Sequence, residues 1–141
     1  MASSKWQVAS STWQGACAAV VLGAVILVRG EDDGWTIPSD AAREPNPVVL
    51  SAQVLAKGKD LYKSKCQKCH GATGIGNGPD ADPKHKPGNL TDPARASRNP
   101  DGVMFYKVWN GRKDPKMPAM RSELSREDVW TAVHYVKTFR K

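Results

Sequence analysis

The sequence predicts a small all-α domain that follows one membrane-spanning helix and an extended tether. Three observations lead to this prediction. Apolar residues recur at three- and four-residue spacing in the second half of the chain, an uncharged segment lies near the N-terminus, and three prolines interrupt the stretch between them. At 141 residues the chain suits one small domain with an appendage. We therefore expect an anchor over residues 1–30, a tether over 31–51 and the domain over 52–141.

The N-terminal segment carries no charge between Lys5 and Arg29. Its most apolar part, residues 15–28, would form a helix of about 21 Å, too short for a hydrocarbon core of about 30 Å. Extended back to Trp6, the helix would reach about 34 Å, which is enough. The alternative is a cleaved signal peptide, but no A-x-A-like site follows the apolar run. We favour an uncleaved anchor and interpret Cys17 within it as a small apolar residue.

The segment 31–51 contains Pro38, Pro45 and Pro47, which disfavour regular structure and favour an extended backbone. Fully stretched, such a tether would reach on the order of 80 Å. A strap packed on the domain surface is the alternative, since Trp35 and Ile37 are suited to docking. The sequence leaves both interpretations open.

The first helix of the domain is expected over 52–65, with Ser51 as its N-cap. One apolar face is formed by Val54, Leu55, Leu61 and Tyr62. Gly58 lies on the same face and would allow another helix to cross closely. Two further helices are expected, one over 101–110 that ends at Gly111 and one that begins at Ser125, where Asp128 completes a capping-box-like pair.

Directly after the first helix comes the pentapeptide C-x-x-C-H, formed by Cys66, Cys69 and His70. This spacing is the signature of c-type haem attachment, because two thiols on one turn can reach the vinyl groups at one porphyrin edge. The next residue, His70, is then placed to ligate the iron. A zinc site would need further ligands, for which only His85 and His134 remain, and a redox dithiol is expected near a βαβ pattern.

Residues 71–100 are rich in glycine and proline and are expected to form loops. Glycines suit a backbone that passes close to a flat cofactor. A ligating histidine usually donates its second N–H to an acceptor, and we expect the Pro87 carbonyl to accept from His70. Leu90 is expected against the haem face, with ordinary loop packing as the alternative for both residues.

The net charge is +7, with lysine and arginine spread along the second half of the chain. No basic run with interleaved aromatic residues is present, so a nucleic-acid partner is not expected. The positive charge indicates either a solvated surface or long-range attraction to an acidic partner. The lysines expected near the haem edge are Lys63, Lys65, Lys68 and Lys84.

With C-x-x-C-H near its start and Met-Pro before a terminal aromatic helix, the stretch 54–141 resembles the class I c-type cytochromes. In that family a glycine and an aromatic residue precede the first haem cysteine by eight and four positions, and Gly58 and Tyr62 match. The resemblance implies a small all-α globule around one haem. It also implies that these two residues meet the terminal helix, where Trp130 and Tyr135 are the candidates.

The same resemblance implies a methionine as the second iron ligand, and Met117, followed by Pro118, matches that pattern. Met120 is the alternative, although we expect Met120 and Met104 to fill gaps in the core. Ligation by His70 and Met117 would fill both axial positions and raise the reduction potential.

The resemblance implies electron transfer for a respiratory or photosynthetic membrane complex, with the haem domain on the periplasmic, extracytoplasmic side. We do not expect an enzyme. A peroxidase-like enzyme or a gas sensor would need an open iron position and a distal acid–base group, for which His85 is the available loop histidine. A passive relay inside a larger assembly stays open as a third interpretation.

Overall fold

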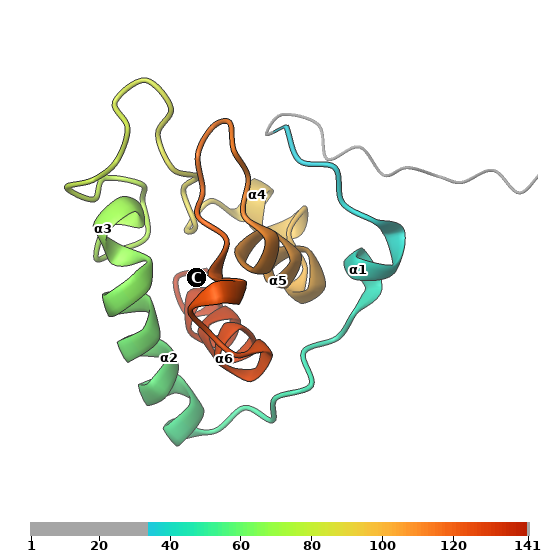
Figure 1. Ribbon diagram of the computed structural model, residues 1–141. Helices are drawn as coiled ribbons and strands as arrows, with labels where there is room; N and C mark the ends of the chain where they lie inside the picture. The colour runs from blue at the N-terminus through green and yellow to red at the C-terminus, as the bar shows by residue number, and fades with distance from the viewer. Residues whose placement is uncertain (1–33, 141) are drawn as a thin grey trace, which may run out of the picture.

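The computed structural model describes residues 34–140, and this part of the chain is built from short helices joined by loops (Figure 1). Its secondary structure includes no strand, so the all-α expectation is confirmed for these residues. The anchor expected over residues 1–30 and Cys17 lie outside the described residues. None of the helices between residues 34 and 140 has the length and apolar character that crossing a bilayer requires.

The three helices expected from the sequence are present. They are α2 (Ala52–Lys65), α5 (Asp101–Asn110) and α6 (Arg126–Lys137). The Ser51 hydroxyl accepts from the Val54 amide at 3.1 Å and so caps α2. Ser125 and Asp128 form a complete capping box at the start of α6, as expected.

The centre of the domain is the crossing of α2 and α6. A Cβ atom on Gly58 would lie 2.7 Å from the Thr131 carbonyl oxygen and 2.8 Å from Tyr135 Cβ, so only glycine allows this approach. The Tyr62 ring packs one turn further along, 5.5 Å from the Tyr135 ring between centroids. The expected meeting of Gly58 and Tyr62 with Tyr135 is therefore confirmed.

The other aromatic candidate, Trp130, lies in the core on the side of α5. Its ring stacks on Phe105 at 4.1 Å between centroids. Met120 and Val129 complete this cluster of buried side chains. Met120 is only 7% exposed, which confirms that it packs in the core. It begins the short 3₁₀ helix η1 (Met120–Ser122).

The stretch 34–51 is a strap packed on the domain, one of the two interpretations that the sequence left open, and the extended tether expected over 31–51 is wrong for these residues. Pro38 precedes a one-turn helix, α1 (Ser39–Arg43), which packs against α5. Pro38 is the N-cap of this helix, and its carbonyl accepts from the Ala42 amide at 3.1 Å. Ile37 is buried at 7% exposure.

Two hydrogen bonds hold the second half of the strap against α6. The Asn46 amide donates to the Trp130 carbonyl at 3.0 Å, and the His134 ring nitrogen Nε2 lies 2.7 Å from the Val48 carbonyl. These contacts join positions more than 80 residues apart. They explain why the prolines alone could not distinguish a strap from a tether.

Two short helices and two loops complete the domain. The helices are α3 (Gln67–His70) and α4 (Pro93–Ser97), the latter lying inside the region expected to be loops. Figure 1 shows α3, the loop that follows it and the orange loop between α5 and η1 at the same end of the molecule. This end carries both the C-x-x-C-H segment and Met117.

Candidate functional site

The C-x-x-C-H segment is folded into one turn, as its spacing predicts. Cys66 ends α2, where its amide donates to the Tyr62 carbonyl at 2.9 Å. The amides of Cys69 and His70 both donate to the Cys66 carbonyl, at 3.1 and 2.9 Å. Cys66 is thus the N-cap of the short helix α3, and Cys69 and His70 lie within that helix.

The loop that follows α3 holds this turn in place through the backbone. The carbonyls of Lys68, Cys69 and His70 have no helical partner, since α3 ends here. Each accepts from the loop: the amides of Asp80, Gly78 and Gly76 donate to them at 2.8, 3.1 and 2.8 Å, respectively. Backbone hydrogen bonds therefore connect three consecutive residues of the motif to the loop.

Two loop glycines lie where the backbone of the loop packs closely. At Gly76, with φ of +83°, an added Cβ atom would collide with the Pro87 carbonyl oxygen. At Gly78 it would meet the Lys68 carbonyl. These glycines allow the loop to pack on its own backbone and on α3, and close passage beside a cofactor stays a prediction.

Tyr62 links the helix crossing to the motif. Its hydroxyl donates to the Gly71 carbonyl at 2.7 Å, and the side chain is only 2% exposed. Burial, followed by the nearby Cys66 thiol, raises the pKa of Tyr62 above its usual range, so the hydroxyl stays a donor at neutral pH. Because Gly71 directly follows His70, this bond helps to set the position of the histidine backbone.

The imidazole of His70 is held by a carbonyl, but not by the one expected. Its Nδ1 lies 3.3 Å from the Gly88 oxygen, so Pro87 as the acceptor is a wrong prediction. The Pro87 carbonyl is turned toward Gly76, which leaves the next carbonyl to face the histidine. A carbonyl only accepts, so Nδ1 carries the proton and Nε2 keeps a free lone pair.

The electrostatic surroundings keep this imidazole neutral. Burial lowers the pKa of His70 below its ordinary value of 6.5; the bond to Gly88 opposes this effect, and the positive charge of Arg95 adds to it. A neutral imidazole with a free Nε2 is the form that ligates a metal. The residue therefore has the protonation state and the fixed ring nitrogen that axial ligation of iron requires.

The two thiols are free and half-buried. Burial, followed by the nearby Cys69, raises the pKa of the Cys66 thiol to about 11. A redox-active dithiol needs a thiol with a lowered pKa, so this environment argues against thioredoxin-like chemistry. Two free thiols three positions apart beside a neutral histidine fit covalent attachment of haem c.

The other two histidines, His85 and His134, contact groups away from the C-x-x-C-H motif, which argues against a zinc site. His85 lies on the exposed loop, where its Nδ1 is 3.2 Å from an Asp82 carboxylate oxygen. His134 contacts the strap through the Val48 carbonyl. Neither residue completes a ligand set with Cys66 and Cys69.

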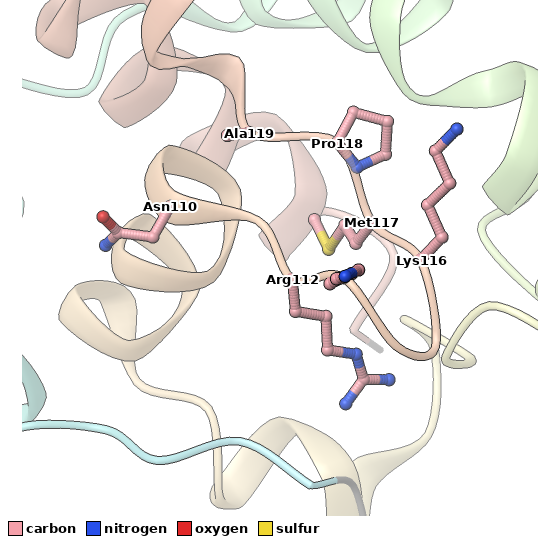
Figure 2. A pocket seen from close by; sticks show the side chains of 7 residues that line it. Asn110, Arg112, Lys116, Met117, Pro118 and Ala119 are labelled. Carbon is pink, nitrogen blue, oxygen red and sulfur yellow. The ribbon is translucent and has the colours of Figure 1, made fainter.

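The methionines of the described chain differ in what they contact. Met120 packs in the core, and Met104, 8% exposed, has its sulfur 2.8 Å from an Arg140 guanidinium nitrogen. Met117 is half-buried in the loop between α5 and η1, beside a pocket (Figure 2). Among Met104, Met117 and Met120, Met117 is therefore the methionine that lines a pocket, whereas the other two are buried.

Leu90 is half-buried beside the motif loop. Its amide donates to the Gly74 carbonyl at 2.7 Å, and its Cβ atom lies against the Gly74 backbone. This contact fits loop packing and leaves the expected contact with a haem face a prediction.

Several residues at this site were not identified from the sequence. The Gly88 acceptor, the loop amides on the motif carbonyls and the position of Arg95 depend on how two loops fold back. Gly88 follows Pro87 directly, so the sequence indicated the right turn but not which carbonyl faces inward. Arg95 contacts Gly88, and an added Cβ atom there would lie 2.9 Å from its Nη1.

Comparisons with known proteins agree with this chemistry. A family model described as cytochrome c oxidase, cbb3-type, subunit III, matches residues 53–136. Among the curated proteins, none matches the chain.

Two solved structures are similar to the chain. One is a c-type cytochrome named KustC0563, which is 26% identical with a TM-score of 0.52, and the match covers 60% of this chain and 98% of that one. The other is the Kuenenia stuttgartiensis reducing HAO-like protein complex Kustc0457/Kustc0458, 27% identical with a TM-score of 0.57. That match covers 67% of this chain and 47% of the other, so the chain spans about half of that protein's length.

Proposed function

The chain belongs to the family described as cytochrome c oxidase, cbb3-type, subunit III, and from this premise we propose that it carries single electrons through one covalently bound haem c with His70 and Met117 as axial ligands. The observation that carries the proposal is the environment of His70. Its buried, neutral imidazole is tied to Gly88 through Nδ1, so Nε2 stays available beside two free thiols. A side chain held in this way is prepared for ligation.

Each residue of the site has a defined role in this proposal. Cys66 and Cys69 supply the two sulfurs for the thioether bonds, and His70 supplies the first axial nitrogen. Met117 supplies a soft sulfur, which favours the reduced metal and so raises the potential. When bound, haem c supplies an iron centre that gains and loses one electron at a time. With both axial positions taken by side chains, the site leaves no position for a substrate.

An enzyme or a gas sensor is the alternative, and one similar structure is named as a reducing HAO-like protein complex. Such a function would need a free axial position with a distal acid–base group. His85 lies on an exposed loop and pairs with Asp82, which favours the electron carrier.

We also propose that the partner is a respiratory or photosynthetic membrane complex with an acidic docking surface. Lys63, Lys68 and Lys84 are exposed near the motif and its loop, and Ile75 adds an apolar contact at 48% exposure. Lys65 pairs with Glu123 at 2.8 Å, so it contributes less charge. Positive charge of this kind increases the rate of encounter with an acidic surface.

The haem domain is proposed to lie on the periplasmic side, with residues 1–30 as its membrane anchor. Because the strap is packed from residue 34 onward, only residues 31–33 separate it from that anchor. Four peptide steps, from residue 30 to residue 34, span at most about 14 Å. The domain would therefore be held near the membrane as a fixed subunit rather than swing on a long tether.

An absorption spectrum tests the proposed ligation. The ferric full chain should show the weak near-red iron–thioether band, and Met117→Ala should abolish it. Met120→Ala is the control, because that side chain packs in the core. Loss of the band only in Met120→Ala would overturn the assignment, and carbon monoxide binding to the wild-type ferrous form would favour the alternative functions.

A further inference from the structure

The strap places one aromatic ring on the base of the loop that carries Met117. The Arg112 guanidinium carbon lies 4.8 Å from the centroid of the Trp35 ring, and the Lys107 ammonium lies 5.4 Å from it. Both distances are within the roughly 6 Å over which an aromatic face attracts a cation. Trp35 is half-buried, so water screens these contacts only in part.

Arg112 in turn holds the backbone of Met117. The Arg112 amide donates to the Met117 carbonyl at 2.8 Å, and the Met117 amide donates to the Arg112 carbonyl at 2.9 Å. This reciprocal pair closes the loop 112–117. The Arg112 side chain also donates through Nε to the Pro115 carbonyl at 2.9 Å. One arginine therefore connects both arms of the loop to its tip.

The two side chains leave the loop in different directions. Figure 2 shows Met117 and Arg112 starting next to each other on the two arms, with the guanidinium pointing away from the thioether sulfur. The arginine head is thus available for Trp35, while the methionine sulfur faces the pocket. Nothing in this arrangement requires Trp35 to touch Met117.

The strap gives Trp35 a fixed support. Ile37 is buried two residues further along, α1 packs on α5, and Asn46 bonds to α6. Because the Trp35 ring is held in place, it limits the positions that the Arg112 guanidinium can adopt. We infer that Trp35 is a positioning residue: through Arg112 it keeps the Met117 loop closed, so that the thioether stays where the proposed function needs an iron ligand.

This inference rests on the proposed function, and its test separates the two. Hydrogen exchange of the Arg112 and Met117 amides in the haem-loaded, reduced full chain reports opening of the loop. Trp35→Ala should speed exchange of both amides about tenfold, because two partly buried cation–π contacts are lost. Amides in the middle of α6 should change less than about twofold. Trp35→Phe, which keeps an aromatic face, should restore most of the protection.

Imidazole binding to the ferric full chain gives the second readout. Its apparent affinity rises in proportion to the fraction of molecules with an open axial position, so Trp35→Ala should bind about tenfold more tightly. Trp35→Phe, which keeps an aromatic face toward Arg112, should leave this affinity close to the wild-type value.

Unchanged exchange of the Arg112 and Met117 amides in Trp35→Ala would overturn the inference, whichever ligand the iron has. Faster exchange together with unchanged imidazole affinity would instead overturn Met117 as the ligand. The role inferred for Trp35 toward the iron would then be lost as well.

Discussion

Replacing Gly58 by alanine should destabilise the domain, although alanine is the better helix former. The added Cβ atom would lie 2.7 Å from the Thr131 carbonyl oxygen and 2.8 Å from Tyr135 Cβ. Both atoms belong to or adjoin the α6 backbone, so neither can rotate aside. Helix propensity favours alanine by about 1 kcal/mol. Overpacking at such a contact costs up to about 3 kcal/mol, so the net loss should be about 2 kcal/mol.

Urea and thermal denaturation of the haem-loaded protein, followed by circular dichroism, would measure this loss. We expect the melting temperature of Gly58→Ala to fall by about 10 °C. Ala56→Gly, at an exposed position of the same helix, isolates the propensity contribution and should cost about 1 kcal/mol. The reasoning is refuted if Gly58→Ala is more stable than the wild type by the amount that Ala56→Gly loses.

Two further changes test other contacts. Tyr62→Phe leaves the buried Gly71 carbonyl without its donor, so urea denaturation should show a loss of about 1–2 kcal/mol, and an unchanged midpoint would mean that the bond adds no stability. The pKa of Asp128 is held below its ordinary 3.8, first by the hydrogen bond from Lys57 and then by Ser125. Its ionised form therefore stabilises the fold above that pH, and this stability is lost as the pH falls through the lowered pKa. Asp128→Asn should flatten the decline in unfolding free energy below about pH 5, whereas a decline as steep as in the wild type would contradict the assignment.

Local patterns predicted the parts of this fold that local interactions determine. The helices over 52–65 and 101–110 have the expected bounds, because a capping residue or a terminal glycine marks their ends. The C-x-x-C-H turn was expected as well, because two cysteines three positions apart fit on one helical turn. The burial of Met120 was also expected, since methionine fills gaps in cores.

The errors concern contacts between distant parts of the chain. The strap depends on bonds from Asn46 and Val48 to α6, and no local pattern encodes these. The choice of Gly88 over Pro87 depends on a loop that folds back so that one carbonyl faces Gly76 and the next faces His70. Consecutive carbonyls of a loop can point in different directions, and the sequence does not show which one points inward.

The mass of the denatured polypeptide tests the central claim most directly. The full chain and a Cys66→Ala/Cys69→Ala double variant would be produced in a cell that attaches haem to C-x-x-C-H, and both would then be extracted with acidified acetone. We predict that the wild-type chain is heavier than its polypeptide by one haem, and that the double variant has the polypeptide mass alone. A wild-type chain without the added mass would contradict covalent attachment at Cys66 and Cys69, and with it the proposed electron transfer.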